Sequence, residues 1–288
     1  MLTLSKNTEE KSMIFLHVPK AAGTTLHQII ERQYKSNTIF SLNVETNEEF
    51  INEFRKLSEP QRKNIRVFKG HMNFGLHKFL PQPFPYITMV RDPVERIISH
   101  YYYILRNPTH YLYNEVTSRN MSLKDYVCSE ISIELDNDQT RLLAGRHKTD
   151  VGFGKCSSSV LETAKKNIEE HFAVVGISER FDETLILLKN LFRWKLPFYV
   201  KANVTTNRLL KKEIAEDTLK LIEKHNELDI ELYTYAKKRF EQLIIQQGPS
   251  FERELELFKL LNKPYGKVFS FSQGASRFCK NIKWQVDH

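Results

Sequence analysis

Short apolar runs alternate with segments of helical period through the first two-thirds of the chain. The apolar runs predict buried strands near residues 13–18, 38–42, 65–69, 86–90 and 172–177. The segments with apolar residues three and four apart predict helices near residues 24–34, 47–57, 93–106, 122–130, 158–171 and 178–193. Because strands that alternate with helices favour parallel pairing, we expect an α/β domain with a central parallel sheet between layers of helices.

From about residue 213 the pattern becomes purely helical. One apolar face recurs at Leu228, Leu232, Ala236, Phe240 and Leu243, which is typical of a long amphipathic helix. Gly248 and Pro249 should end it, and a shorter helix near residues 251–262 is expected to follow. The pattern therefore predicts one domain over residues 1–247 and a helical C-terminal extension of unknown role over residues 248–288.

The first predicted strand leads into a loop suited to an anion. After the strand comes the segment Pro19-Lys20-Ala21-Ala22-Gly23-Thr24-Thr25-Leu26. Small residues let backbone N–H groups approach a phosphate, and the N-terminus of the following helix adds unpaired donors and a positive dipole end. A Walker A loop places its lysine after the last glycine, whereas Lys20 precedes Gly23, so an ordinary ATP or GTP loop fits poorly. On its own the segment is also consistent with a turn before an ordinary helix.

A second motif follows the fourth predicted strand. Pro93 should begin a helix there, because its missing N–H costs nothing in the first turn. Arg91 then lies at the carboxyl end of a parallel strand, where open α/β sheets bind their ligands. Arg91 and Ser99 together would suit a phosphate, the first by charge and forked donors and the second by a short hydrogen bond. Alternatively, Arg91 is a surface ion-pair partner of Asp92 or Glu95.

Together these two segments resemble the donor-binding elements of the glycan O-sulfotransferases. Those enzymes use 3′-phosphoadenosine 5′-phosphosulfate (PAPS), and both the Pro-Lys-x-x-Gly-Thr-Thr loop and the Arg-Asp-Pro-x-x-Arg-x-x-Ser segment, about seventy residues apart, are similar to theirs. The resemblance implies a P-loop-like three-layer fold. It also implies that residues Lys20 to Leu26 hold the 5′-phosphosulfate, while Arg91 and Ser99 hold the 3′-phosphate.

A histidine between the two motifs strengthens the resemblance. Gly70-His71 stands where heparan sulfate 2-O-sulfotransferases have a Gly-His pair whose histidine is the acceptor's general base, and 6-O enzymes also carry a base in this interval. A lone histidine at a strand end is more often inert, but its place between the two motifs favours His71 as the base. Lys69 stands where the 2-O enzymes have a second histidine, so acceptor recognition is expected to differ. His17 is expected inside the first strand, in a structural role.

The resemblance continues downstream and covers roughly residues 13–243. The segment Leu135 to Gly145 is similar to the Asn-x-Gln-x-Arg-x-Leu-Ala stretch of the 6-O enzymes. Later segments match the family's strand, nucleotide-contacting loop and terminal helix. By this resemblance we expect Asn203, Thr205 and Arg208 near the adenosine of the donor.

The predicted activity is in-line transfer of a sulfuryl group from PAPS to a hydroxyl of a carbohydrate acceptor. His71 would accept the hydroxyl proton, and Lys20 would stabilise charge on the departing 5′-phosphate. We expect no metal, because no Asp/Glu/His cluster has ligand spacing along the sequence. Two alternatives remain: a kinase-like P-loop enzyme, disfavoured by the position of Lys20, and a non-catalytic glycan-binding relative, disfavoured by retention of the predicted site residues.

Composition narrows the partners only in part. Among 288 residues, 43 Lys and Arg stand against 35 Asp and Glu, a net charge of +8 that suits a nucleotide or an acidic glycan. No helix-turn-helix or RNP signature supports a nucleic-acid partner. No apolar run approaches the ~18–20 residues that span a bilayer, and the polar start lacks a signal-peptide core, so the chain as given is expected to be cytoplasmic. The acceptor and the oligomeric state are not indicated.

Overall fold

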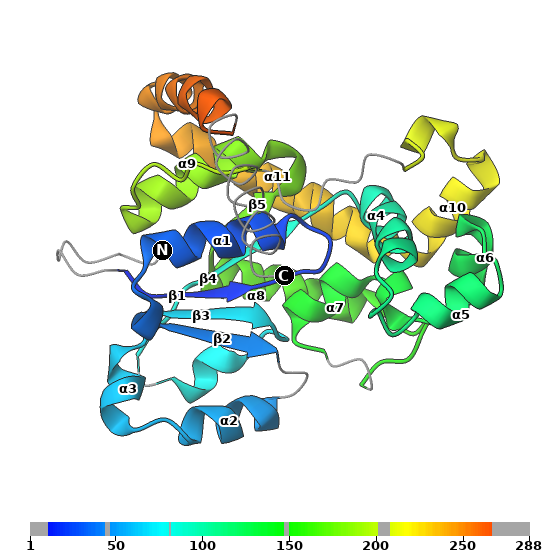
Figure 1. Ribbon diagram of the computed structural model, residues 1–288, viewed down its shortest axis with the longest axis horizontal. Coiled ribbons are helices and arrows are strands. Elements are labelled where there is room, and N and C mark those ends of the chain that lie inside the picture. Colours follow the sequence, from blue (N-terminus) through cyan, green and yellow to red (C-terminus); the bar gives the residue numbers. More distant parts are fainter. Residues whose placement is uncertain (1–10, 44–46, 81, 147–149, 201–207, 267–288) are drawn as a thin grey trace, which may run out of the picture.

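Five parallel strands form a sheet in the order β2-β3-β1-β4-β5. The computed structural model describes residues 11–43, 47–80, 82–146, 150–200 and 208–266 (Figure 1). The strands are β1 (Met13–Leu16), β2 (Ile39–Asn43), β3 (Val67–His71), β4 (Tyr86–Val90) and β5 (Phe172–Ile177). All five strands predicted from the apolar runs are confirmed, as is their parallel pairing.

The described helices fall between and after these strands. They are α1 (Gly23–Gln33), α2 (Asn47–Arg55), α3 (Glu59–Asn64), α4 (Pro93–Arg106), α5 (Tyr113–Ser118), α6 (Leu123–Cys128), α7 (Asp138–Ala144), α8 (Ser158–His171), α9 (Phe181–Phe192), α10 (Glu216–His225) and α11 (Glu227–Gln247). Short 3₁₀ turns are η1 (Ser36–Thr38), η2 (Leu76–Phe79), η3 (Ile133–Leu135), η4 (Ser178–Arg180) and η5 (Lys211–Glu213). Helices α3, α5 and α7 were not predicted.

Helices cover both faces of the sheet, which gives the three-layer α/β fold expected from the sequence. In Figure 1, α1 and α9 lie above β1, while α2 and α3 lie below β2. Helices α8, α9 and α11 pack against β5. The strands are buried on both faces, as their continuous apolar sequences require: every residue of β1 and β4 is buried.

Apolar side chains form two separate cores. The larger one surrounds the sheet, and the smaller one joins α4, α5, α6 and α10 around Ile97, Val116, Tyr126 and Ile222. Figure 1 shows the arrowheads of β1, β2 and β3 pointing toward the side of the molecule where these four helices lie. The small core therefore builds a wall that faces the carboxyl ends of the strands.

One glycine allows two strands to meet at this edge. Gly70 has a φ of 145°, and a Cβ there would lie 1.8 Å from the carbonyl oxygen of Leu42 in β2. A side chain at this position would push β2 and β3 apart. The close pairing that Gly70 permits leaves the next residue, His71, exposed at the end of β3.

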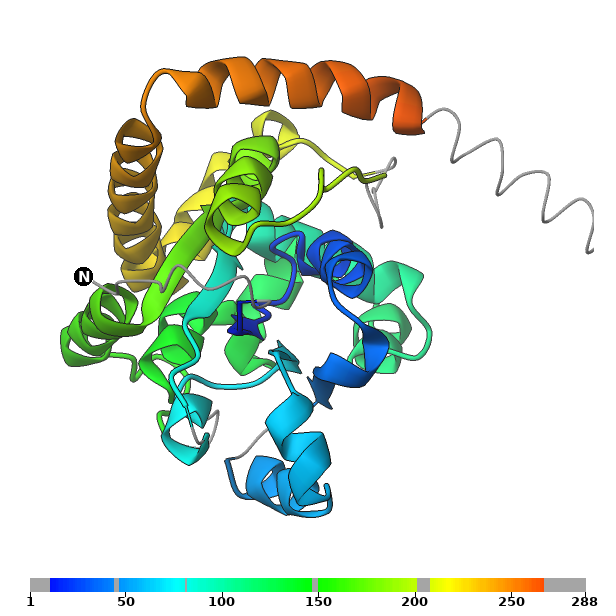
Figure 2. The ribbon, with the colours of Figure 1, turned by 90° about the vertical axis from the view of Figure 1, so that its left-hand side faces the viewer.

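The chain continues past α11 as a second helical segment. Gly248, with a φ of 76°, follows the last residue of α11, and residues 250–266 are helical and cross the top of the molecule in Figure 2. Phe251, Leu255 and Phe258 are buried in the larger core. The domain division between residues 247 and 248 stays a prediction. Within the described part of the chain, none of the helices combines the length and apolarity that crossing a bilayer requires.

Candidate active site

A cleft of about 1320 Å³ opens at the carboxyl ends of the strands. Of the site residues predicted from the sequence, it is lined by Lys20, Ala22, Gly23, Thr24, Thr25, His71, Arg91, Ser99 and Arg208. The other two described ones, Ala21 and Leu26, have side chains buried in the larger core, so only their backbone can face a ligand. Asn203 and Thr205 lie outside the described residues. The topology thus brings segments from distant parts of the sequence to one edge of the sheet, where open α/β sheets bind ligands.

The loop between β1 and α1 has an unusual backbone. Lys20 and Ala22 have φ values of 65° and 64°, in the left-handed region that costs a non-glycine residue about 1–3 kcal/mol. Ala22 is the N-cap of α1, and it provides no capping side chain. The first-turn amides of α1 therefore lie at the cleft with their positive dipole end exposed to it, which suits an anion.

Lys20 extends from this loop across the cleft. Its Nζ lies 3.5 Å from the ring centroid of Tyr103 in α4, a cation–π contact. Burial, followed by the charges of Arg106 and Arg91, lowers the pKa of Lys20 to about 8. The ammonium is therefore still mostly protonated at neutral pH, and its desolvation strengthens its attraction for an anion.

Two arginines share one carboxylate beside the loop. Nη2 of Arg91 lies 3.2 Å from Oε2 of Glu95, and Nη2 of Arg208 lies 2.8 Å from the same oxygen. Nη1 of Arg91 also donates to the carbonyl of Lys20 at 3.2 Å. Arg91 does pair with Glu95, as the alternative interpretation of the sequence expected. However, this ion pair lies in the cleft, and it holds two guanidinium groups together. Ser99, one turn beyond Glu95 on α4, lines the same side of the cleft.

Gln139 in α7 fixes the backbone of Arg91. Its side-chain oxygen accepts from the Arg91 N–H, and its Nε2 donates to the Arg91 carbonyl, both at 3.0 Å. Gln139 is 1% exposed, so these bonds are shielded from water. The sequence contained this residue within a family-like segment but gave no sign of the role.

Two buried side chains hold Gln139 in place by capping each other's helices. Asp229 in α11 accepts from the N–H groups of Gln139 at 3.1 Å and Thr140 at 2.7 Å. In return Asn137 accepts from the N–H groups of Leu228 at 2.9 Å and Asp229 at 3.1 Å. Each cap satisfies helix-terminal amides that would otherwise be orphaned, so the position of Arg91 depends on α11.

His71 lies beside a second histidine rather than alone. Its ring stacks on that of His17, with centroids 4.3 Å apart and planes 27° apart. His17 lies one residue past β1, and it lines the cleft. The expectation that His17 is a structural residue inside the strand is therefore wrong in its position, because β1 ends at Leu16.

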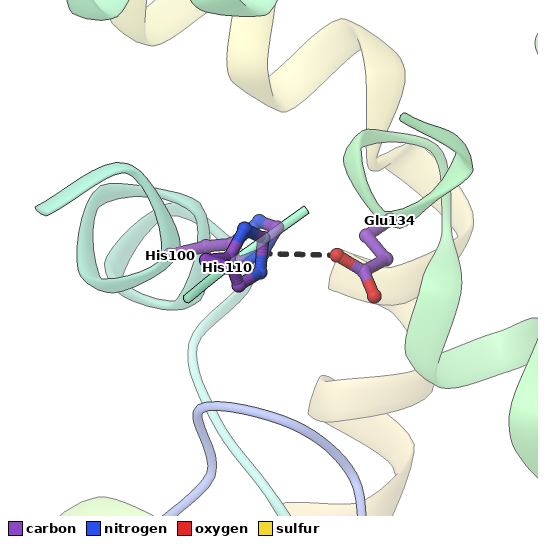
Figure 3. Close-up of side chains that lie close together, drawn as sticks. All are labelled: His100, His110 and Glu134. Atoms are coloured by element: carbon purple, nitrogen blue, oxygen red, sulfur yellow. Dashed lines mark ion pairs between the residues drawn. The ribbon is translucent and has the colours of Figure 1, made fainter. Parts of the chain in front are cut away.

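A second group of titratable side chains lies farther along the cleft (Figure 3). Nε2 of His100 lies 2.9 Å from Oε2 of Glu134, and the candidate ligand atoms of His100, His110 and Glu134 all lie within 4.8 Å of one another. A metal ion would fit this spacing. However, Nδ1 of His100 bonds the hydroxyl of Tyr126 at 3.0 Å, and Nδ1 of His110 accepts from the N–H of Leu112 at 3.2 Å. The expectation of a site without metal stays a prediction.

Ser178, the residue after β5, also lines the cleft, and its hydroxyl is buried. Ser178 Oγ is shielded from solvent and makes no hydrogen bond to any residue in the described ranges. Because buried polar groups are nearly always satisfied, this hydroxyl is an exception within the described ranges. Its position after the last strand places it near the arginines rather than near His71.

The fold and the cleft define a three-layer α/β protein whose candidate anion-binding loop follows the first strand. Residues 3–264 match the family model of the galactose-3-O-sulfotransferases. The chain belongs to that family, which confirms the resemblance to glycan O-sulfotransferases found in the sequence.

Curated relatives include enzymes of two neighbouring types. Human heparan-sulfate 6-O-sulfotransferase 1 is 29% identical over 202 residues, which cover 61% of this chain and 47% of that protein. Heparan sulfate 2-O-sulfotransferase hst-2 of Caenorhabditis elegans is 25% identical over 285 residues, 88% of this chain and 85% of that protein. The chain therefore spans about half the length of the first relative. The solved mouse sulfotransferase SULT7A1 complexed with PAP aligns with a TM-score of only 0.37 and 12% identity over 88% of this chain and 90% of that chain.

Proposed function

We propose that this protein transfers a sulfuryl group from PAPS to a hydroxyl of a carbohydrate acceptor. The observation that carries the proposal is the convergence of three groups on one cleft. They are the loop between β1 and α1 with Lys20, called here the anion loop, the pair Arg91 and Arg208, and His71. Membership of a sulfotransferase family and the similarity to heparan sulfate enzymes support it. No single element would suffice, because each has an ordinary structural explanation.

In this proposal the donor lies across the loop with its two phosphate ends separated. Lys20, Gly23, Thr24 and Thr25 surround the 5′-phosphosulfate, with Ala21, Ala22 and Leu26 contributing backbone only. The 3′-phosphate, which distinguishes PAPS from a plain adenosine 5′-phosphate, binds Arg91, Arg208 and Ser99. The shared carboxylate of Glu95 holds the two guanidinium groups side by side. Asn203 and Thr205 remain proposed contacts of the adenosine.

The chemistry is an in-line displacement at sulfur. The acceptor oxygen forms a bond to sulfur while the bond from sulfur to the 5′-phosphate oxygen breaks, and PAP (3′-phosphoadenosine 5′-phosphate) leaves. His71 takes the acceptor's proton, for which its exposure at the end of β3 is suited. Lys20 and the loop amides stabilise the charge that develops on the departing phosphate.

The wall opposite the sheet is the proposed acceptor side. Tyr111 is 63% exposed there, and its hydroxyl is held by Ser132 Oγ at 2.9 Å, which fixes the ring as a flat surface for a sugar. Arg146 and His110 line the same side and could bind acidic or hydroxyl groups of a glycan.

The direct test is transfer of radiolabelled sulfate from PAPS to glycans. Desulfated heparan chains and galactose-terminated oligosaccharides should be compared as acceptors, because the relatives and the family differ in this respect. We expect labelled glycan with the native protein, about 10²–10⁴-fold slower labelling with His71→Ala, and normal labelling with the control His171→Ala, a histidine outside the cleft. PAP binding without any transfer would indicate a non-catalytic relative, and transfer that requires Mg·ATP would indicate a kinase-like enzyme.

A further inference from the structure

A chain of hydrogen bonds runs from the protein surface to the loop that follows β1. Oε1 of the half-exposed Glu31 lies 2.7 Å from Nζ of Lys69, a side chain that is almost fully buried. Nζ of Lys69 in turn lies 3.2 Å from Nδ1 of His27. Nε2 of His27 lies 3.1 Å from Nδ1 of His17. Three buried or half-buried groups are thus aligned behind the cleft.

The chemistry of lysine fixes the direction of this chain. An ammonium group has donors only, so Nδ1 of His27 must accept and, in a neutral ring, Nε2 of His27 must carry the hydrogen. That hydrogen is donated to Nδ1 of His17, which leaves the hydrogen of His17 on Nε2. Burial is the main cause that lowers the pKa of His27 to about 4 and that of His17 to about 2, so both rings are neutral at pH 7.

The Nε2 edge of His17 faces the anion loop. A Cβ built on Gly23 would lie 2.0 Å from both Nε2 and Cδ2 of His17, so this edge of the ring is packed on the first residue of α1. His17 lines the cleft, and Nε2 makes no hydrogen bond to any residue in the described part of the chain. The face of the ring meanwhile stacks on His71.

We propose that His17 is a further donor of the anion site, a neutral imidazole whose Nε2–H bonds an oxygen of the 5′-phosphosulfate. Lys69 and His27 are positioning residues that fix this tautomer from behind. The inference rests on the proposed function for the identity of the anion. It also explains why Lys69 is buried at a position where a histidine is expected in related enzymes. The Lys69 ammonium can only donate, so it sets the direction of the hydrogen bonds through His27 to His17.

Neutrality of His17 has a second consequence for the reaction. A charged imidazolium stacked 4.3 Å from His71 would oppose protonation of His71 and weaken it as a base. A neutral imidazole can instead donate to a developing anion without that penalty, as neutral histidines do in other enzymes. The arrangement therefore gives a donor to the leaving group and keeps the proposed base proton-accepting.

The tautomer can be read directly by long-range ¹⁵N–¹H correlation NMR on the full chain labelled at histidine nitrogens. His17→Phe assigns the His17 signals. We expect the proton on Nε2 and a deprotonated Nδ1 at pH 7, and a shift of the Nε2 signal on addition of PAP but not of adenosine 3′-phosphate, which lacks the 5′ group. A proton on Nδ1, or the same response to both ligands, would overturn the inference. Apart from the assignment, the measurement uses the unsubstituted protein, and it needs no activity.

The positioning role is tested by Lys69→Met, with Lys56→Met on the exposed surface as the control. Lys69→Met should produce a mixture of His17 tautomers, whereas Lys56→Met should leave the pattern unchanged. In transfer assays His17→Phe should lower kcat by roughly 10²–10³-fold, the effect of losing one donor to a developing anion, and His17→Gln should recover part of that loss. Equal kcat for His17→Phe and the native protein would overturn the inference, while failure of the native protein to bind PAP would instead refute the proposed function.

Discussion

Replacing Gln139 by methionine should weaken the proposed PAPS site, although Gln139 does not line the cleft. Methionine has a similar length and no amide, so the N–H and the carbonyl of Arg91 would both lose their partners. An unsatisfied buried backbone group costs about 1–3 kcal/mol. Arg91 is partly exposed, which reduces the cost of leaving its N–H and carbonyl without partners. We therefore expect the loss of both bonds to lower the free energy of unfolding by about 2–4 kcal/mol, a large fraction of a typical 5–15 kcal/mol.

The functional effect should be selective. A loosened Arg91 would weaken the proposed charge-assisted hydrogen bond to the 3′-phosphate. Such a bond is worth about 1.5–3 kcal/mol, so the preference for PAP over AMP should fall roughly 10–100-fold. Affinity for AMP, which lacks the 3′-phosphate, should stay nearly unchanged. Calorimetric titration gives both affinities, and urea unfolding gives the stability.

Gln246→Met is the matched control, because Gln246 is an exposed residue near the end of α11. It should leave stability and both affinities at native values. If Gln139→Met also keeps native stability and the native preference for PAP, the clamp on Arg91 has no energetic role and the reasoning from buried hydrogen bonds is refuted.

Three further predictions concern residues of the cleft itself. His71→Ala should lower kcat about 10²–10⁴-fold in a transfer assay while the calorimetric Kd for PAP stays the same; an equal loss of PAP binding would remove His71 from the role of base. Arg91→Ala should abolish most of the preference for PAP over AMP, and an unaltered preference would disprove the 3′-phosphate assignment. Because the pKa of Lys20 is lowered to about 8, PAP affinity should decline as pH rises through that value and the ammonium loses its proton. Lys20→Arg should remove this decline, and a native titration that is flat between about pH 7 and 9 would contradict the role of Lys20.

Much of the fold could be predicted because its signals are local. Each strand is a short apolar run, and the helices around the sheet carry apolar residues at helical spacing, so all five strands and the long helices were found. Helix α7 escaped because its residues Asp138 to Arg141 are polar yet buried, which leaves no amphipathic pattern. Its stability comes from Asp229, ninety residues later, a contact that no local pattern encodes.

The candidate site divides in the same way. Lys20, His71 and Arg91 each stand next to a strand end, and the parallel sheet necessarily brings such ends together, so their convergence could be predicted. The chain from Lys69 through His27 to His17 could not, because it depends on how the side chains of β3 and α1 meet in space. The contact between His100 and Glu134 could not be predicted either, because the two residues are far apart in the sequence.

Calorimetric titration of the native protein with PAP, run against ADP and AMP with and without Mg²⁺, tests the central claim most directly. The proposed site predicts tight binding of PAP that is independent of Mg²⁺ and stronger than the binding of ADP or AMP. The reason is that Arg91 and Arg208 are proposed to bind a 3′-phosphate, which ADP and AMP lack. Failure to bind PAP, or a preference for ADP that requires Mg²⁺, would contradict it.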